Sequence, residues 1–87
     1  MELLETVKMM ESEDYRERFR AEYFQLKIRM EKLGDLLNKY RTNALTFAPK
    51  CDYELLFSQY IFMKHYKDIL EERAKIEEVN LEIKKEG

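Results

Sequence analysis

Basic and aromatic side chains lie close together near the start of the chain. Arg16, Arg20 and Lys27 recur at helical spacing and share a face of a predicted helix. Tyr23 and Phe24 lie beside them. A guanidinium supplies charge for a phosphate and a ring supplies a stacking surface for a base, so this pattern indicates a nucleotide or another anion. The alternative is that neighbouring glutamates pair with the arginines as ordinary surface ion pairs.

A second group of polar side chains lies in residues 41–51, where the helical spacing is lost and the one proline of the chain occurs. Connections between helices rarely exceed eight residues, and longer ones are often functional. This segment provides two cations and three hydrogen-bonding side chains: Arg41, Thr42, Asn43, Thr46 and Lys50. We predict that these five residues bind a ligand. The alternative is a purely structural role, in which Leu45 and Phe47 plug the end of the core.

Catalytic chemistry is not expected. Cys51 lies in the connection and His65 lies within the following helix, about 20 Å further along at 1.5 Å per residue. A thiol and an imidazole must approach to about 3 Å to act together, so they form no nucleophilic pair. One histidine and one cysteine are also too few for a structural zinc site, which needs four ligands. We therefore predict no catalytic residue, no metal site and no cofactor.

The scarcity of helix breakers predicts an all-α fold. With one proline and two glycines in 87 residues, long helices are expected. We predict a single domain, 1–87, with a short N-terminal helix over 1–11, a helix over 13–41, a loop over 42–51 and a helix over 52–84. Ser12 and Asp52 are predicted helix caps. The two long helices form an antiparallel hairpin, because the apolar positions of the first recur at alternating steps of four and three.

The second long helix is apolar on more than the one face that its hairpin partner can cover. A chain this short also has a marginal core, and its single cysteine excludes an internal disulfide. We therefore predict assembly into a homo-oligomeric helical bundle. The predicted oligomer interface consists of Phe57, Tyr60, Ile61, Phe62 and Tyr66.

Charge is distributed unevenly around a formal net charge of −2. Residues 27–67 carry eight basic and four acidic side chains, whereas 1–26 and 68–87 each carry four basic and seven acidic ones. In a hairpin the turn end is then basic and the open end acidic, which favours a small anion near the turn and disfavours duplex nucleic acid. The charges exclude a membrane span, and the first ten residues lack the pattern of a signal peptide. We expect a cytosolic protein.

The sequence also resembles a family of small proteins from gut bacteriophages, first annotated in a crAss-like phage. The resemblance covers about residues 15–81. It lies in the run 45–51, Leu-Thr-Phe-Ala-Pro-Lys-Cys, and in matching positions of both long helices, among them Glu17-Arg18-Phe19 and Arg73-Ala74. More remotely, the helical hairpin is similar to phage anti-CBASS sponges, homo-oligomers that sequester cyclic nucleotides between subunits. In those proteins a tyrosine near the start of the hairpin stacks on a base, which makes Tyr15 a candidate ligand-binding residue here. The lysine and threonine that accompany it there have no match in this sequence.

These resemblances imply a phage protein that acts in the cytoplasm of an infected bacterium. The expected function is a non-enzymatic sponge, of the anti-CBASS or anti-Thoeris type, that binds a cyclic di- or trinucleotide or a related messenger in intersubunit pockets. Two alternatives remain open at this point. The chain could be a helical interaction module that inhibits a host protein, or a structural or assembly component of the phage.

Overall fold

The computed structural model describes residues 2–81 and is helical, with three helices in that part of the chain: α1 (Leu3–Met10), α2 (Tyr15–Arg41) and α3 (Tyr53–Glu77). Asp14 caps α2, because its side chain accepts a hydrogen bond from the backbone N–H of Arg16. The predicted cap, Ser12, instead accepts from the backbone N–H of Asp14 at 3.1 Å. Asp52 caps α3 and accepts from the N–H of Leu55 at 2.8 Å, as its sequence position suggested.

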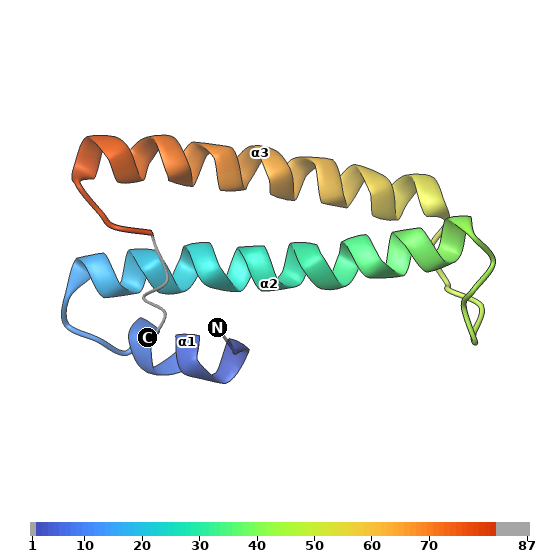
Figure 1. Cartoon of the computed structure of the whole chain (residues 1–87), viewed down its shortest axis with the longest axis horizontal. Helices are drawn as coiled ribbons and strands as arrows, with labels where there is room; N and C mark the ends of the chain where they lie inside the picture. The colour runs from blue at the N-terminus through green and yellow to red at the C-terminus, as the bar shows by residue number, and fades with distance from the viewer. Residues whose placement is uncertain (1, 82–87) are drawn as a thin grey trace, which may run out of the picture.

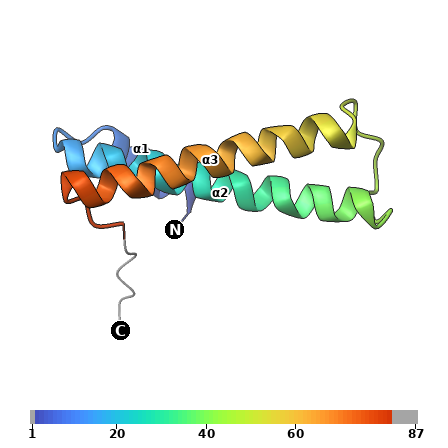
Figure 2. The same ribbon diagram turned by 90° about the horizontal axis from the view of Figure 1, so that it is seen from above.

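The two long helices run antiparallel and are joined at one end by the loop 42–52 (Figure 1). Seen from above, α3 crosses over α2, so the two helices lie at an angle to each other (Figure 2). The short α1 packs against α2 on the side away from α3 (Figure 1). The order of layers is therefore α1, α2, α3, with α2 in the middle. No helix in the described part of the chain is both long and apolar enough to cross a bilayer.

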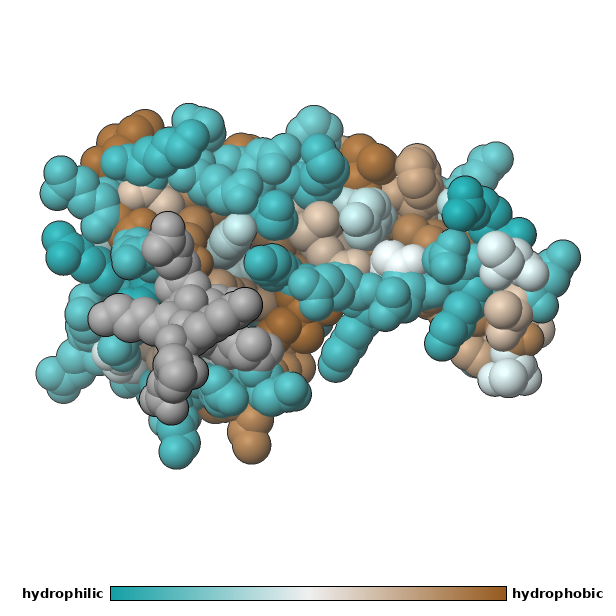
Figure 3. Space-filling view, in the orientation of Figure 1, coloured by the Kyte–Doolittle hydropathy of each residue, from teal (hydrophilic) through white to brown (hydrophobic). Residues whose placement is uncertain are grey.

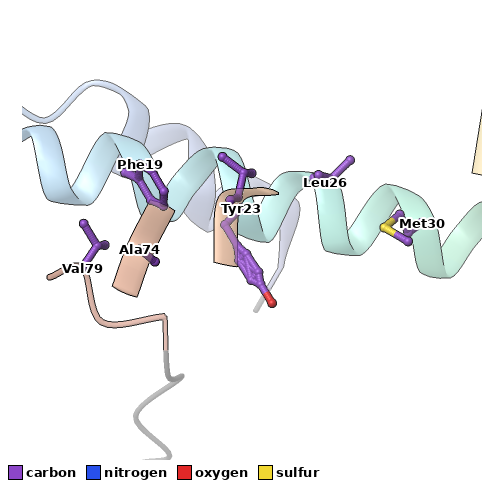
Figure 4. Packing of buried hydrophobic residues seen from close by; sticks show 7 residues of the cluster. Phe19, Tyr23, Leu26, Met30, Ala74 and Val79 are labelled. Atoms are coloured by element: carbon purple, nitrogen blue, oxygen red, sulfur yellow. The ribbon is translucent and has the colours of Figure 1, made fainter. Parts of the chain in front are cut away.

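The core lies in the half of the hairpin that is nearer the open end (Figure 4). Helix α2 supplies most of it, while α3 supplies only two fully buried residues, Leu70 and Ala74. The cluster consists of Phe19, Tyr23, Leu26, Met30, Leu70, Ala74 and Val79. Toward the loop the packing is thinner, since Leu37 is the one buried residue of α2 beyond Met30. The loop half of the hairpin therefore has more exposed surface between its helices.

Helix α1 is held to α2 by a buried polar contact as well as by apolar packing. Thr6 is fully buried, and its hydroxyl donates to the carbonyl of Leu3 while accepting from Gln25 Nε2 at 3.0 Å. Ala21 and Phe24 of α2 are buried although neither belongs to the cluster shared with α3. An isolated eight-residue helix is marginal in water, so these contacts with α2 are what stabilise α1.

Helix α3 ends at Glu77, whereas the sequence predicted a helix to residue 84. Glu78 adopts a left-handed conformation with φ 58°, and the N–H of Val79 donates to the carbonyl of Ala74 at 2.9 Å. This reversal buries Val79 in the core. Burial of that side chain and closure of the helix end by a left-handed residue account for the earlier stop. The remainder of the predicted helix, 82–84, lies outside the described residues.

Candidate functional site

Hollows follow one side of the contact between α2 and α3. Their lining residues recur at steps of three and four on both helices, so they lie along one inter-helix groove. On α2 the groove passes Tyr23, Lys27, Glu31, Gly34, Asn38 and Arg41; on α3 it passes Tyr53, Phe57, Tyr60, Lys64, Lys67 and Glu71. In Figure 3 a band of pale and brown residues between the long helices is bordered by hydrophilic side chains.

The hollow at the turn end of the groove combines aromatic rings with a guanidinium. It has a volume of about 210 Å³, and Arg41, Tyr53, Phe57 and Tyr60 are among the residues that line it. The rings of Tyr53 and Phe57 are stacked, with centroids 5.9 Å apart. Tyr40 meets Tyr53 edge-on at 5.7 Å. These rings support one another and present an exposed aromatic surface, since Phe57 is 44% exposed.

Arg41 is an available cation at this hollow. Its side chain is exposed, and its Nη2 donates to Asn38 Oδ1 at 3.1 Å. Within residues 2–81 no carboxylate lies within ion-pair distance of it. Because the guanidinium has five donors, most of its hydrogen-bonding capacity remains for a ligand.

Gly34 faces Tyr60 across the same hollow. A Cβ atom built at this position would lie 3.5 Å from Tyr60 Cε2, which is an ordinary van der Waals contact. The missing side chain therefore widens the hollow without being required for the helices to approach. The geometry at Gly34 is that of a small space beside an aromatic ring.

The next hollow along the groove is cationic. Three lysines, Lys27, Lys64 and Lys67, line it together with Met30, Glu31 and Tyr60, and its volume is about 220 Å³. Lys64 pairs with Asp68 at 3.8 Å, an exposed contact worth little. Lys67 pairs with Glu71 at 3.6 Å, which leaves Lys27 as the lysine of this hollow with no carboxylate within ion-pair distance among residues 2–81. A phosphate here would meet Lys27 directly and would compete with two weak surface pairs for Lys64 and Lys67. Tyr60 lines both this hollow and the aromatic one, so the two adjoin.

At the open end the groove widens to about 820 Å³, but its chemistry is different. Asp68, Glu71 and Glu72 line it with a single lysine, Lys75, among the described residues. Three carboxylates repel a phosphate, so this hollow is the least suited to an anion of the three along the groove.

Tyr23 and Glu71 separate the acidic and the cationic stretches. The Tyr23 hydroxyl donates to Glu71 Oε2 at 3.0 Å, and Lys67 Nζ lies 3.6 Å from the same oxygen. Burial, and then the bond to Glu71, raise the pKa of Tyr23 to about 12. Glu71 thus fixes both a core tyrosine and one of the lysines of the groove.

The predicted ligand residues of the first helix lie at its N-terminal end. Tyr15 is 42% exposed and meets Phe19 edge-on at 6.2 Å. Arg16 is exposed. Arg20 is half-buried, and its Nε is buried without a hydrogen-bond partner among residues 2–81.

The predicted ligand residues of the loop are exposed and partly engaged in local structure. The Thr42 hydroxyl donates to the carbonyl of Asn38 at 2.9 Å, which helps to end α2. Asn43 adopts φ 57°. Thr46 lines a separate hollow of about 230 Å³ that also includes two lysines, Lys32 and Lys39. Lys50 is exposed.

These two predicted groups lie at opposite ends of α2. The helix has 27 residues, so about 40 Å separate its ends at 1.5 Å per residue. Of the eight predicted ligand residues, Arg41 is the one that the structure places in the inter-helix groove.

The predicted interface residues fall on different sides of α3. Phe57 and Tyr60 line the groove. Ile61 is half-buried, whereas Phe62 is 74% and Tyr66 43% exposed on the surface. Sequence reasoning missed the groove lysines of α3 and Tyr53. The available signal was the spacing 53, 57, 60, 64 and 67, which alternates by four and three and changes from aromatic to basic.

Cys51 is a free, exposed thiol. No group of three or more His, Cys, Asp or Glu side chains within the described range is arranged to hold a metal ion.

Residues 13–76 match the family model described as Sequestin, which covers α2, the loop and nearly all of α3. No curated protein and no solved structure matches the chain.

Proposed function

The chain belongs to the Sequestin family, and we propose that it is a non-catalytic protein that sequesters a cyclic nucleotide messenger. The family name points to sequestration, which is a binding function and requires no turnover. A cyclic dinucleotide, a cyclic trinucleotide or a cyclic ADP-ribose isomer each combines flat bases with phosphates. Such a ligand fits a phage protein that blunts CBASS- or Thoeris-type signalling in the cytoplasm of an infected bacterium.

The observation that carries this proposal is the neighbourhood of aromatic rings and cations in the groove, where Arg41 and Lys27 have no carboxylate within ion-pair distance among residues 2–81. Tyr53 and Phe57 offer a stacking surface, and Arg41 lies at the same hollow. Tyr60 also lines the neighbouring hollow, which contains the three lysines Lys27, Lys64 and Lys67. A base would stack on the rings at the turn end, and the phosphates would lie against Arg41 and the lysines. Nucleotide binding needs both an aromatic surface for the base and cations for the phosphates.

The aromatic and the lysine-lined hollows are too small to enclose such a ligand on a single chain. Each measures about 210–220 Å³, below the roughly 300–1,000 Å³ of typical small-molecule sites. A nucleotide in the groove would keep one side exposed on a single chain. We propose that another subunit of a homo-oligomer covers that side. The exposed loop residues Thr46 and Lys50, and Tyr15, Arg16 and Arg20 at the other end of α2, remain candidate contacts from such a subunit.

Isothermal titration with the three messenger classes tests the proposal, and Arg41→Gln is the decisive variant. We expect saturable binding of at least one messenger by the wild type. Loss of a charged hydrogen bond costs about 1.5–3 kcal/mol, so the variant should bind on the order of ten- to hundred-fold more weakly. Its melting temperature should not change, because Arg41 is exposed and bonds only to Asn38 among the described residues.

Arg29→Gln is the matched control for that titration. Arg29 is an exposed arginine of the same helix, and it lines none of the hollows described above. The Arg29→Gln substitution removes one positive charge, as Arg41→Gln does, and leaves the residues of the groove unchanged. Equal weakening by both variants would reduce the effect to net charge and would count against the groove; absence of heat with every messenger would count against nucleotide binding itself.

A further inference from the structure

The outer face of α3 carries an apolar stripe that neither α1 nor α2 covers. Leu55, Phe62, Ile69 and Ile76 occur seven residues apart and are 61%, 74%, 58% and 81% exposed. Tyr66 lies between the middle two and is 43% exposed. We call these five residues the outer seam.

The seam is distinct from the face that α3 turns toward α2. That inner face carries Leu70 and Ala74, with Tyr60 and Met63 packed against the same core. At 100° per residue the seam lies roughly 110° around the helix from the inner face, on the flank away from Lys64 and Phe57 of the groove. In Figure 3 hydrophobic surface reaches the upper border of the molecule, which α3 forms.

A spacing of seven residues has a specific structural meaning. It keeps a stripe in contact with a partner along the full length of a helix only when the two supercoil, as in a coiled coil. A partner for this stripe must therefore be a helix of the same period and comparable length. A second copy of α3 has the same period and the same length, so it meets this condition. Around a two-fold axis, the same stripe of each chain contacts that of the other.

We propose that the outer seam of one chain packs against the outer seam of a second copy in antiparallel orientation. The charge distribution selects this orientation. Residues 27–67, the turn end, carry a net charge of +4, whereas 68–81 carry two basic and five acidic side chains, a net charge of −3. Antiparallel packing places the basic end of each chain beside the acidic end of the other. Parallel packing would place like ends together, which is unfavourable.

This pairing leaves the inter-helix groove of both chains free for a ligand and for the further subunit proposed above to cover it, because the seam and the groove occupy different flanks of α3. The seam therefore goes beyond the proposed ligand site and does not depend on it. Loss of pairing and loss of messenger binding can be separated by titrating the same variants with messenger.

Sedimentation equilibrium on the wild type and on Phe62→Glu tests the pairing. We expect reversible association of the wild type and at least a tenfold weaker association of the variant. Phe62 is 74% exposed, so the single chain should keep its helicity, and Ile69→Ser provides a second variant. Phe47→Glu is the matched control, because Phe47 is a 59% exposed phenylalanine of the loop that lies off the seam. A strictly monomeric wild type, or equal loss in the control, would overturn the proposal.

Disulfide cross-linking tests the orientation. In a Cys51→Ser background, Leu55→Cys and Ile76→Cys lie 21 residues apart, about 31 Å along the helix. Antiparallel packing should give cross-linked dimers when the two variants are mixed, and little product from either alone. Efficient cross-linking of Leu55→Cys to itself would instead establish parallel packing and contradict the inference.

Discussion

Gly34→Ala separates stability from binding at one position, because its two expected effects have opposite signs. Glycine inside a helix destabilises it by roughly 0.5–1 kcal/mol relative to alanine. The added methyl group would lie 3.5 Å from Tyr60 Cε2, so it makes an ordinary contact without a clash. We therefore expect the free energy of unfolding to rise by about 0.5–1 kcal/mol. For a domain of this size that is a rise in melting temperature of roughly 2–8 °C.

The same methyl group occupies space in the aromatic hollow. Gly34 lines it beside Arg41, Tyr53, Phe57 and Tyr60. If a base stacks there, the variant should bind messenger more weakly although it is more stable. Thermal denaturation followed by circular dichroism, at one fixed protein concentration and with and without messenger, measures both effects.

Two results would refute this reasoning. A lower melting temperature without messenger would mean that Tyr60 cannot accept the methyl group, so that the glycine serves a close approach of the helices. Unchanged messenger affinity in a stabilised protein would mean that the ligand does not enter the aromatic hollow. Arg29→Gln, which lies off the groove, should leave both quantities unchanged.

Other perturbations test the fold and its electrostatics. Leu70→Ala removes a side chain that is 1% exposed at the centre of the core and should cost about 2–5 kcal/mol in chemical denaturation; a loss below 1 kcal/mol would contradict the core assignment. Asp52→Ala removes the cap of α3 and should cost about 0.5–2 kcal/mol, with Asp52→Asn as the conservative control that retains most of the stability. Tyr23→Phe should be less stable than the wild type at neutral pH through loss of the bond to Glu71. Since the pKa of Tyr23 is raised from 10.0 to about 12, the wild type holds this stabilisation below pH 10 and loses it as the pH rises toward 12. The difference between the two proteins should therefore narrow over that range, and a constant difference would argue against the shift.

The helical content and the main heptad of the core were predictable from the sequence. Phe19, Tyr23, Leu26 and Met30 follow the alternating spacing that predicted a helix packed along its length, and the structure buries all four. Asp52 could be predicted as a helix cap, because a short acidic side chain ahead of an apolar run strongly indicates the start of a helix. Assembly into an oligomer is not tested by a single chain and stays a prediction.

The end of α3 and the composition of the groove were harder to predict. The apolar residues Val79 and Leu81 continue a plausible helical pattern, and only tertiary packing of Val79 into the core reveals the reversal at Glu78. The prediction from the sequence grouped basic residues that are close in sequence, as in the loop. The groove instead combines basic residues from two antiparallel helices, so Lys27 and Lys64 line one hollow although 37 positions separate them.

Recovery of the bound messenger is the most direct test of sequestration. A cyclic nucleotide is incubated with excess protein, the mixture is passed through a filter that retains the protein, and the retained fraction is heat-denatured and analysed by chromatography. We expect the messenger to be held on the protein and released chemically unchanged, in an amount that saturates with protein concentration. Messenger of all classes passing freely through the filter, or recovery of a converted product, would contradict a non-catalytic sequestering function.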